Sequence, residues 1–154
     1  MSGARIPKVT AKCRCKKVVL EIIELDPGFA CCHCSTCQYI HSGPGFGASC
    51  NDVKIVQGAE LVNGYKPAAW ATWNFCGNCG TRLHYKFEDE AWKSKQNRYV
   101  VSVGLLYEAC VKNFKMMNEV SYDEKPPYYC FAGHREKYTT SETYVQYALD
   151  SLKP

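Results

Sequence analysis

The chain has 154 residues, of which 46% are hydrophobic and 22% charged, and it carries a formal net charge of +4 at pH 7. This composition is typical of an ordinary soluble globular protein, and the length favours one domain over residues 1–154. There is no apolar run of about 18 residues and no apolar leader, so we expect neither a membrane span nor a secretory signal.

The amino-terminal part of the chain predicts short strands and one short helix. Residues 8–25 alternate between apolar and polar side chains, which predicts two strands that fold back at "CRCKK". Residues 29–34 predict a third strand, and Ser35 would cap a helix over residues 36–41. The following "SGPGFG" predicts a flexible glycine loop that ends this helix.

The rest of the chain also favours strands. Short apolar runs bounded by turn residues predict four of them, at residues 53–57, 61–65, 69–75 and 81–87. The Asn63-Gly64 pair in the second run is a hairpin signal. Residues 99–106 are the most apolar run, which should be a central strand, and the spacing of residues 143–152 predicts a closing helix. We therefore expect a mainly β fold with two short helices.

Eleven cysteines, several of them paired as CxC or CxxC in a chain without a secretory signal, favour metal ligands over disulfides. Cys13 and Cys15 should lie on one face of a strand, and Cys76 and Cys79 form a CxxC followed by glycine, which is typical of a zinc knuckle. Four thiolates close a tetrahedral shell, so this set predicts a structural zinc that ties the start of the chain to its middle. The alternative is four buried thiols without metal.

Cys32, Cys34 and Cys37 form a second set of three thiols. Three protein ligands and one open position are typical of a catalytic or exchangeable zinc site. The alternative is a second structural site, whose fourth ligand would be Cys31, Cys50 or a histidine.

Several other residues near this set are candidates for a role. Strand alternation should point Cys31 and His33 away from the metal, with His33 in a supporting polar role. His41, at the edge of the glycine loop, is a candidate general base, although a loop histidine without a role is the more common case. The loop glycines would either shape a substrate entrance or form an ordinary loop, and they are Gly43, Gly45 and Gly47.

Residues further along the chain favour structural roles. His84 should be packed or paired, and His134 should lie on the surface. Trp70 and Trp73 are expected in the core or at its rim. The remaining cysteines are predicted to be small buried residues, and they are Cys50, Cys110 and Cys130.

The order "CRC", "CHCSTCQ", "SGPGFGA" and "FCGNCGTRLHY" resembles the glutathione-dependent formaldehyde-activating enzyme family, which includes centromere protein V and shares the Mss4-like, zinc-containing β fold. The resemblance covers residues 12–106 and leaves a divergent carboxyl-terminal portion, residues 107–154. It implies two zinc ions, a structural one on the first cysteine set and a more labile one on the second. It also implies addition of glutathione to formaldehyde to give S-(hydroxymethyl)glutathione, a carbon–sulfur lyase-type reaction.

Two departures from the family pattern bear on the substrate. Lys16-Lys17 stand where the family usually has glycine and a small residue, and Gln38-Tyr39 stand where it often has arginines. If those arginines bind an anionic thiol, this chain acts on another substrate. A non-catalytic zinc module for protein binding and a thiol redox or metal-buffering protein are the alternative functions.

The charge pattern narrows the choice of partners. Basic residues are scattered, and thiolates bound to two zinc ions would offset most of the positive charge. We therefore expect a small thiol and an aldehyde as partners, rather than nucleic acid or a membrane. The expected location is the cytoplasm, with the nucleus as the alternative, and the oligomeric state is not indicated.

Overall fold

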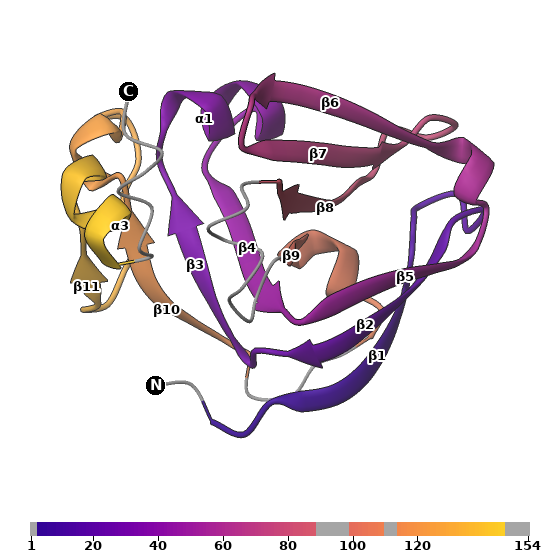
Figure 1. The fold of residues 1–154 in the computed structure, drawn as a ribbon. Helices are drawn as coiled ribbons and strands as arrows, with labels where there is room; N and C mark the ends of the chain where they lie inside the picture. Colours follow the sequence, from indigo (N-terminus) through magenta and orange to yellow (C-terminus); the bar gives the residue numbers. More distant parts are fainter. Residues whose placement is uncertain (1–2, 89–98, 110–113, 147–154) are drawn as a thin grey trace.

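A computed structural model describes residues 3–88, 99–109 and 114–146 of the chain. Among these residues the strands form two sheets (Figure 1). The smaller sheet consists of β1 (Ile6–Lys12), β2 (Val19–Leu25) and β5 (Asp52–Gln57), which pair antiparallel in the order β1-β2-β5. The mainly β fold expected from the sequence is confirmed.

The larger sheet has the strand order β11-β10-β3-β4-β9-β8-β7-β6 among the described residues. In chain order its strands are β3 (Gly28–Cys32), β4 (Gly45–Cys50), β6 (Val62–Ala68), β7 (Ala71–Cys76), β8 (Arg82–Phe87), β9 (Tyr99–Ser102), β10 (Lys115–Val120) and β11 (Glu136–Lys137). Most neighbours are antiparallel, but β10 runs parallel to both β3 and β11. The carboxyl-terminal strands thereby extend the sheet next to the strand that carries the second cysteine set (Figure 1).

Short helices complete the described structure. They are α1 (Ser35–His41), α3 (Thr140–Gln146) and the 3-10 turns η1 (Ala59–Leu61), η2 (Val103–Leu106) and η3 (Tyr122–Glu124). The two α-helices confirm the expected positions, one at the second cysteine set and one near the carboxyl terminus. The closing helix begins at Thr140 rather than at residue 143, and residues 147–152 of the prediction lie outside the described residues. No helix in the described ranges is long and apolar enough to cross a membrane.

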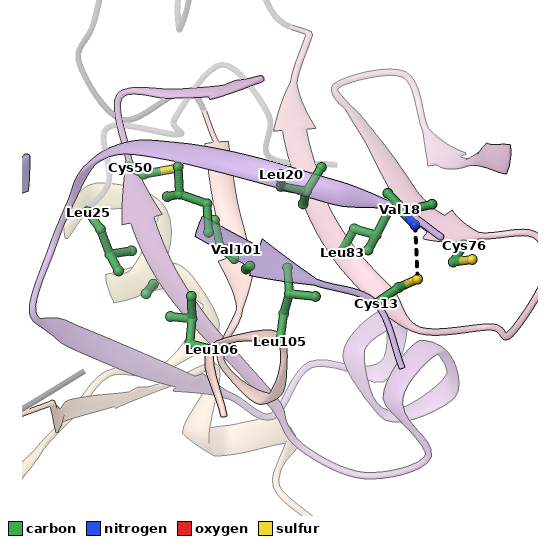
Figure 2. Packing of buried hydrophobic residues seen from close by; sticks show 13 residues of the cluster. Cys13, Val18, Leu20, Leu25, Cys50, Cys76, Leu83, Val101, Leu105 and Leu106 are labelled. Carbon is green, nitrogen blue, oxygen red and sulfur yellow. Dashed lines mark hydrogen bonds between the residues drawn. The ribbon is translucent and has the colours of Figure 1, made fainter. Parts of the chain in front are cut away.

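The main hydrophobic cluster joins the two sheets (Figure 2). Leu20 and Ile22 of β2 are fully buried and belong to the same cluster as Leu83 of β8 and Val101 of β9. Burying one such side chain contributes about 1.5–3 kcal/mol. Figure 2 shows Cys13 and Cys76 at one end of this cluster, so the first cysteine set lies where the two sheets meet.

The glycine-rich segment differs from the expected flexible loop, because Gly45–Cys50 forms β4 between β3 and β9. Glycine inside a strand commonly marks a close approach of a neighbour. A Cβ on Gly47 would lie 2.5 Å from Val100 Cγ1, and one on Gly45 would lie 2.9 Å from His41 Cδ2. The glycines therefore make room for packing within a regular strand.

Two other expectations were also wrong in detail. Asn63 and Gly64 lie inside β6 rather than in a hairpin turn, and the chain reverses after Ala68 instead. The apolar run 99–106 is a strand only as far as Ser102, and η2 then turns Leu105 and Leu106 into the core. As expected, β9 lies in the interior of the larger sheet.

Candidate functional site

The first cysteine set comes together from two turns that are distant in sequence. Cys13 and Cys15 lie in the turn after β1, rather than on the strand itself, and Cys76 and Cys79 flank the turn between β7 and β8. The four sulfur atoms all lie within 4.8 Å of one another. Cys15 Sγ is 3.4 Å from Cys13 Sγ and 3.9 Å from Cys76 Sγ. Tetrahedral Zn–S bonds of about 2.3 Å separate the sulfurs by about 3.8 Å, so these residues fit a zinc ion.

Hydrogen bonds hold the backbone turns around this first set, and one of them is donated to a cysteine sulfur. Val18 N–H donates to Cys13 Sγ at 3.3 Å (Figure 2). Gly80 has φ +77°, a left-handed conformation that glycine adopts readily, and its N–H bonds Cys76 O at 2.7 Å. Burial raises the pKa of the Cys79 thiol, but hydrogen bonds, first of all from the Thr81 hydroxyl, outweigh this and lower it to about 5. These contacts favour the thiolate, which is the form that binds metal.

The second set occupies the junction between β3 and α1. Cys32 ends β3, Cys34 is the residue before α1, and Cys37 lies in its first turn. Their three sulfurs lie within 4.8 Å of one another. Cys37 N–H donates to Cys34 Sγ at 3.4 Å, so Cys34 caps this helix in place of Ser35. The expected cap was wrong because the helix begins one residue earlier, and the Cys34 sulfur accepts the N–H that the Ser35 signal assigned to a hydroxyl.

The pKa values of the three thiols shift in opposite directions. Hydrogen bonds from the thiols of Cys32 and Cys37 lower the pKa of Cys34 to about 3, with further help from backbone N–H groups. The same contacts raise the pKa of Cys32 and of Cys37, because their protons are held by the neighbouring sulfur. The cluster by itself therefore stabilises one thiolate. Three thiolates require a cation, and a soft sulfur donor set of this kind suits zinc.

The neighbours of this set lie where strand alternation placed them. Cys31 and His33 are both fully buried, and neither belongs to the cluster. His33 Nε2 lies 2.8 Å from Glu119 Oε2, and His33 Nδ1 lies 2.6 Å from the Tyr129 hydroxyl. Within the described part of the chain, no fourth ligand joins the three sulfurs, and Cys50 is buried in the main hydrophobic cluster. The set therefore supplies three of the four ligands that a tetrahedral zinc ion takes.

His41 ends α1 close to the sulfurs. A Cβ on Gly45 would lie 3.1 Å from Cys37 Sγ and 3.2 Å from His41 Nε2, so thiol and imidazole both approach this glycine. The His41 ring also packs edge-on against Trp73, with centroids 5.3 Å apart. Burial lowers the His41 pKa, and the positive charge of Arg82 lowers it further. The ring is therefore neutral at pH 7 and able to accept a proton.

An aromatic cluster continues from His41. Trp73 lies 4.3 Å from Tyr85, and Phe87 stacks on Trp70 with centroids 5.8 Å apart. Tyr144 of α3 packs against the same group. Trp73 Nε1 is buried and has no acceptor among the described residues. The cluster therefore places packed aromatic rings and one buried, unpaired donor beside His41.

The structure also shows the burial and contacts of most of the other residues singled out in the sequence. Gly43 lies outside β4, and a Cβ there would meet nothing within 4 Å, so its role in a substrate entrance stays a prediction. His84 is buried and bonded to Asn74 Nδ2 at 3.3 Å, and His134 is exposed, both as expected. Cys130 is exposed, against expectation, and Cys110 lies outside the described residues.

Sequence reasoning missed the polar residues that surround His33. Glu119, Tyr129 and Arg135 lie in the carboxyl-terminal portion, where no pattern was found. The one available signal was an acidic residue within the short, otherwise half-apolar run "KMMNEV", because a buried glutamate needs a partner. Its partner could not be read from local spacing.

Comparison with known proteins adds to this geometry. A family model described as glutathione-dependent formaldehyde-activating enzyme matches residues 8–123, well beyond the expected range of 12–106. A Schizosaccharomyces pombe protein named as an uncharacterised lyase is 31% identical over 137 residues, covering 89% of this chain and 95% of that protein. The crystal structure of a Rhodobacter sphaeroides protein matches with a TM-score of 0.51 at 27% identity, over 63% of this chain and 86% of that one.

Proposed function

The chain belongs to the glutathione-dependent formaldehyde-activating enzyme family, and we propose that it is a zinc-dependent lyase that makes or breaks the carbon–sulfur bond of a thiol–aldehyde adduct. The candidate reaction is addition of glutathione to formaldehyde, which gives S-(hydroxymethyl)glutathione. The observation that carries the proposal is the set of three converging sulfurs, one ligand short of a closed zinc shell, next to a neutral histidine.

Each cysteine set has its own role in this proposal. Cys13, Cys15, Cys76 and Cys79 hold a structural zinc between the two sheets, since four thiolates leave no position for a substrate. Cys32, Cys34 and Cys37 hold the second zinc. When bound there, that ion supplies Lewis acidity and a positive charge that favours a thiolate at neutral pH.

The chain's own residues supply the proton transfers. The substrate thiol loses its proton to His41, and its sulfur forms a bond to the aldehyde carbon. The carbonyl π bond breaks, and the oxygen takes the proton back from His41. The reaction needs no oxidant or reductant, because the product is the sum of the two substrates. Trp73 packs on Tyr85 beside His41, and its buried Nε1–H lacks an acceptor within the described ranges; a ligand oxygen reaching this position would supply one.

Exchange spectroscopy by NMR tests the reaction directly, because it measures the rate at which glutathione and formaldehyde interconvert with their adduct. We expect the zinc-loaded protein to accelerate this exchange, and Cys34→Ser to abolish the acceleration while retaining one zinc. An exchange rate equal to the uncatalysed one would remove the glutathione–formaldehyde assignment. Two inert zinc ions in a protein with no activity towards other thiols would favour the protein-binding module instead.

A further inference from the structure

A buried network of hydrogen-bonded polar side chains lies next to the second cysteine set. His33 stands between two of the proposed ligands and is 0% exposed, while Glu119 is 1% exposed. Both ring nitrogens of His33 are engaged, Nε2 by Glu119 and Nδ1 by Tyr129. The second carboxylate oxygen of Glu119 accepts from Arg135 Nη1 at 3.1 Å. The Glu119 carboxylate therefore has a partner at each of its two oxygens.

The chemistry of the groups in this buried network fixes which atom donates and which accepts in each hydrogen bond. A carboxylate only accepts, so His33 Nε2 carries the proton and donates to Glu119. His33 Nδ1 is then an acceptor and takes the Tyr129 O–H. The Tyr129 oxygen in turn accepts from Gln38 Nε2 at 2.9 Å. Each side chain in this network has a hydrogen-bond partner, which is the condition under which a buried network confers rigidity.

The same carboxyl-terminal stretch also holds the backbone of the cysteine loop. His33 N–H donates to Val120 O at 3.0 Å, and Ser35 N–H donates to Glu124 Oε2 at 2.9 Å. The loop between Cys32 and Cys37 is therefore held at its main chain and at the His33 side chain, and Gln38, the residue after Cys37, adds a further contact. Part of this fastening comes from residues beyond the family match, which ends at residue 123.

We propose that residues 119–135 act as a clamp that holds the Cys32–Cys37 loop in its metal-binding shape and thereby sets how long this site retains its metal. Tyr129 and Arg135 are positioning residues in this clamp, because they act through His33 and Glu119 and touch no sulfur of the set. The inference rests on the proposed function, since it takes the three sulfurs to be a metal site.

The physical reason is preorganisation. A loop that is already ordered loses less conformational entropy when it binds, and it relaxes less easily when a ligand sulfur detaches. Partners that orient metal ligands from outside typically change metal affinity 10–100-fold when they are removed. Loss of the Tyr129 hydroxyl leaves Gln38 Nε2 with only its longer hydrogen bond, 3.4 Å to His33 O, and frees His33 Nδ1. We therefore expect release of the second metal to become about tenfold faster.

Zinc release into a colorimetric chelator tests the clamp on the full chain. Wild type should release two equivalents of zinc in two phases, and Cys34→Ser should lack the faster one. Tyr129→Phe should accelerate only that phase, by about tenfold. Tyr128→Phe is the matched control, because its side chain is adjacent and 80% exposed, and it should release zinc as wild type does. Arg135→Met should act like Tyr129→Phe, and Arg135→Lys should restore part of the retention.

The outcomes separate the clamp from the function on which it rests. Two zinc ions with wild-type release in both Tyr129→Phe and Arg135→Met would overturn the clamp alone. Equal acceleration of both phases in these variants would also overturn it, since that indicates general loosening. A wild type that binds one zinc, which Cys34→Ser retains, would overturn the second metal site and the proposed function with it.

Discussion

Glu119 of β10 lies against His33, with 2.8 Å between Oε2 and Nε2, although the two residues are 86 positions apart in the sequence. The parallel pairing of β10 with β3 places Glu119 opposite Cys31 and brings the carboxylate beneath the CHC segment. The pair is buried, so each polar group in it depends on its partner for a hydrogen bond that water cannot replace.

Removing the Glu119 carboxylate should destabilise the folded protein. Glu119→Ala removes the acceptor of the His33 N–H and of Arg135 Nη1, and it leaves the guanidinium without its counter-charge. We therefore expect a loss of about 3–5 kcal/mol in the free energy of unfolding, measured in urea. Glu21→Ala is the control, because the Lys8–Glu21 pair is partly exposed, with Lys8 57% accessible. It should cost no more than about 1 kcal/mol. Similar losses in the two variants would contradict the assigned importance of the buried pair.

The two cysteine sets should respond differently to loss of a ligand. Cys76→Ser removes a sulfur from the set that joins the two sheets, and we expect it to lower the thermal midpoint strongly or to prevent folding. Cys34→Ser should lose one zinc and keep a cooperative unfolding transition. Metal content and calorimetry measured on the same samples check both. If Cys34→Ser unfolds the protein, the second site is structural.

His41 should matter for activity without affecting metal content. His41→Gln should lower kcat by about 100-fold or more, the usual contribution of a general base, with both zinc ions retained. His134→Gln is the control, since that side chain is exposed. Because burial lowers the His41 pKa, wild-type activity should persist below pH 6.5 and fall only as the pH passes the lowered pKa. A wild-type rate in His41→Gln would exclude the residue as the base.

The buried His84 should make stability depend on pH. Burial, with a contribution from Lys86, lowers its folded pKa to about 4, whereas an unfolded histidine titrates near 6.5. Between these values the unfolded state binds more protons, so stability falls as the pH falls, by about 2 kcal/mol at pH 5. Urea unfolding at pH 7 and pH 5 should show a smaller difference for His84→Gln than for wild type. An unchanged difference would assign the pH dependence to other groups.

Gly45 should be intolerant of a side chain. In Gly45→Ala the new Cβ meets His41 Cδ2 at 2.9 Å and Cys37 Sγ at 3.1 Å, and we expect a loss of about 1–3 kcal/mol in unfolding free energy. Gly43→Ala has open space around its Cβ and should change stability by less than about 0.5 kcal/mol. Equal stabilities would mean that α1 shifts away from β4 without cost.

The two cysteine sets were predictable because their members lie close together in the sequence. The CxC and CxxC spacings limit how far apart two sulfurs can lie, whatever the rest of the chain does. The hairpin at "CRCKK" and the helix after Cys34 are equally local, since alternation and turn residues act over a few positions. The four-sulfur and three-sulfur sets accordingly form as the sequence indicated.

The tertiary structure decided everything that depends on a distant neighbour. Gly45 and Gly47 looked like loop residues, but β3 and β9 pair on either side of them and hold them in a strand. Glu119, Tyr129 and Arg135 carried no recognisable motif, because a buried hydrogen bond requires only that two polar atoms meet, not that they have a fixed spacing in sequence. Local spacing therefore determined which atoms can bind metal, and long-range strand pairing decided what surrounds them.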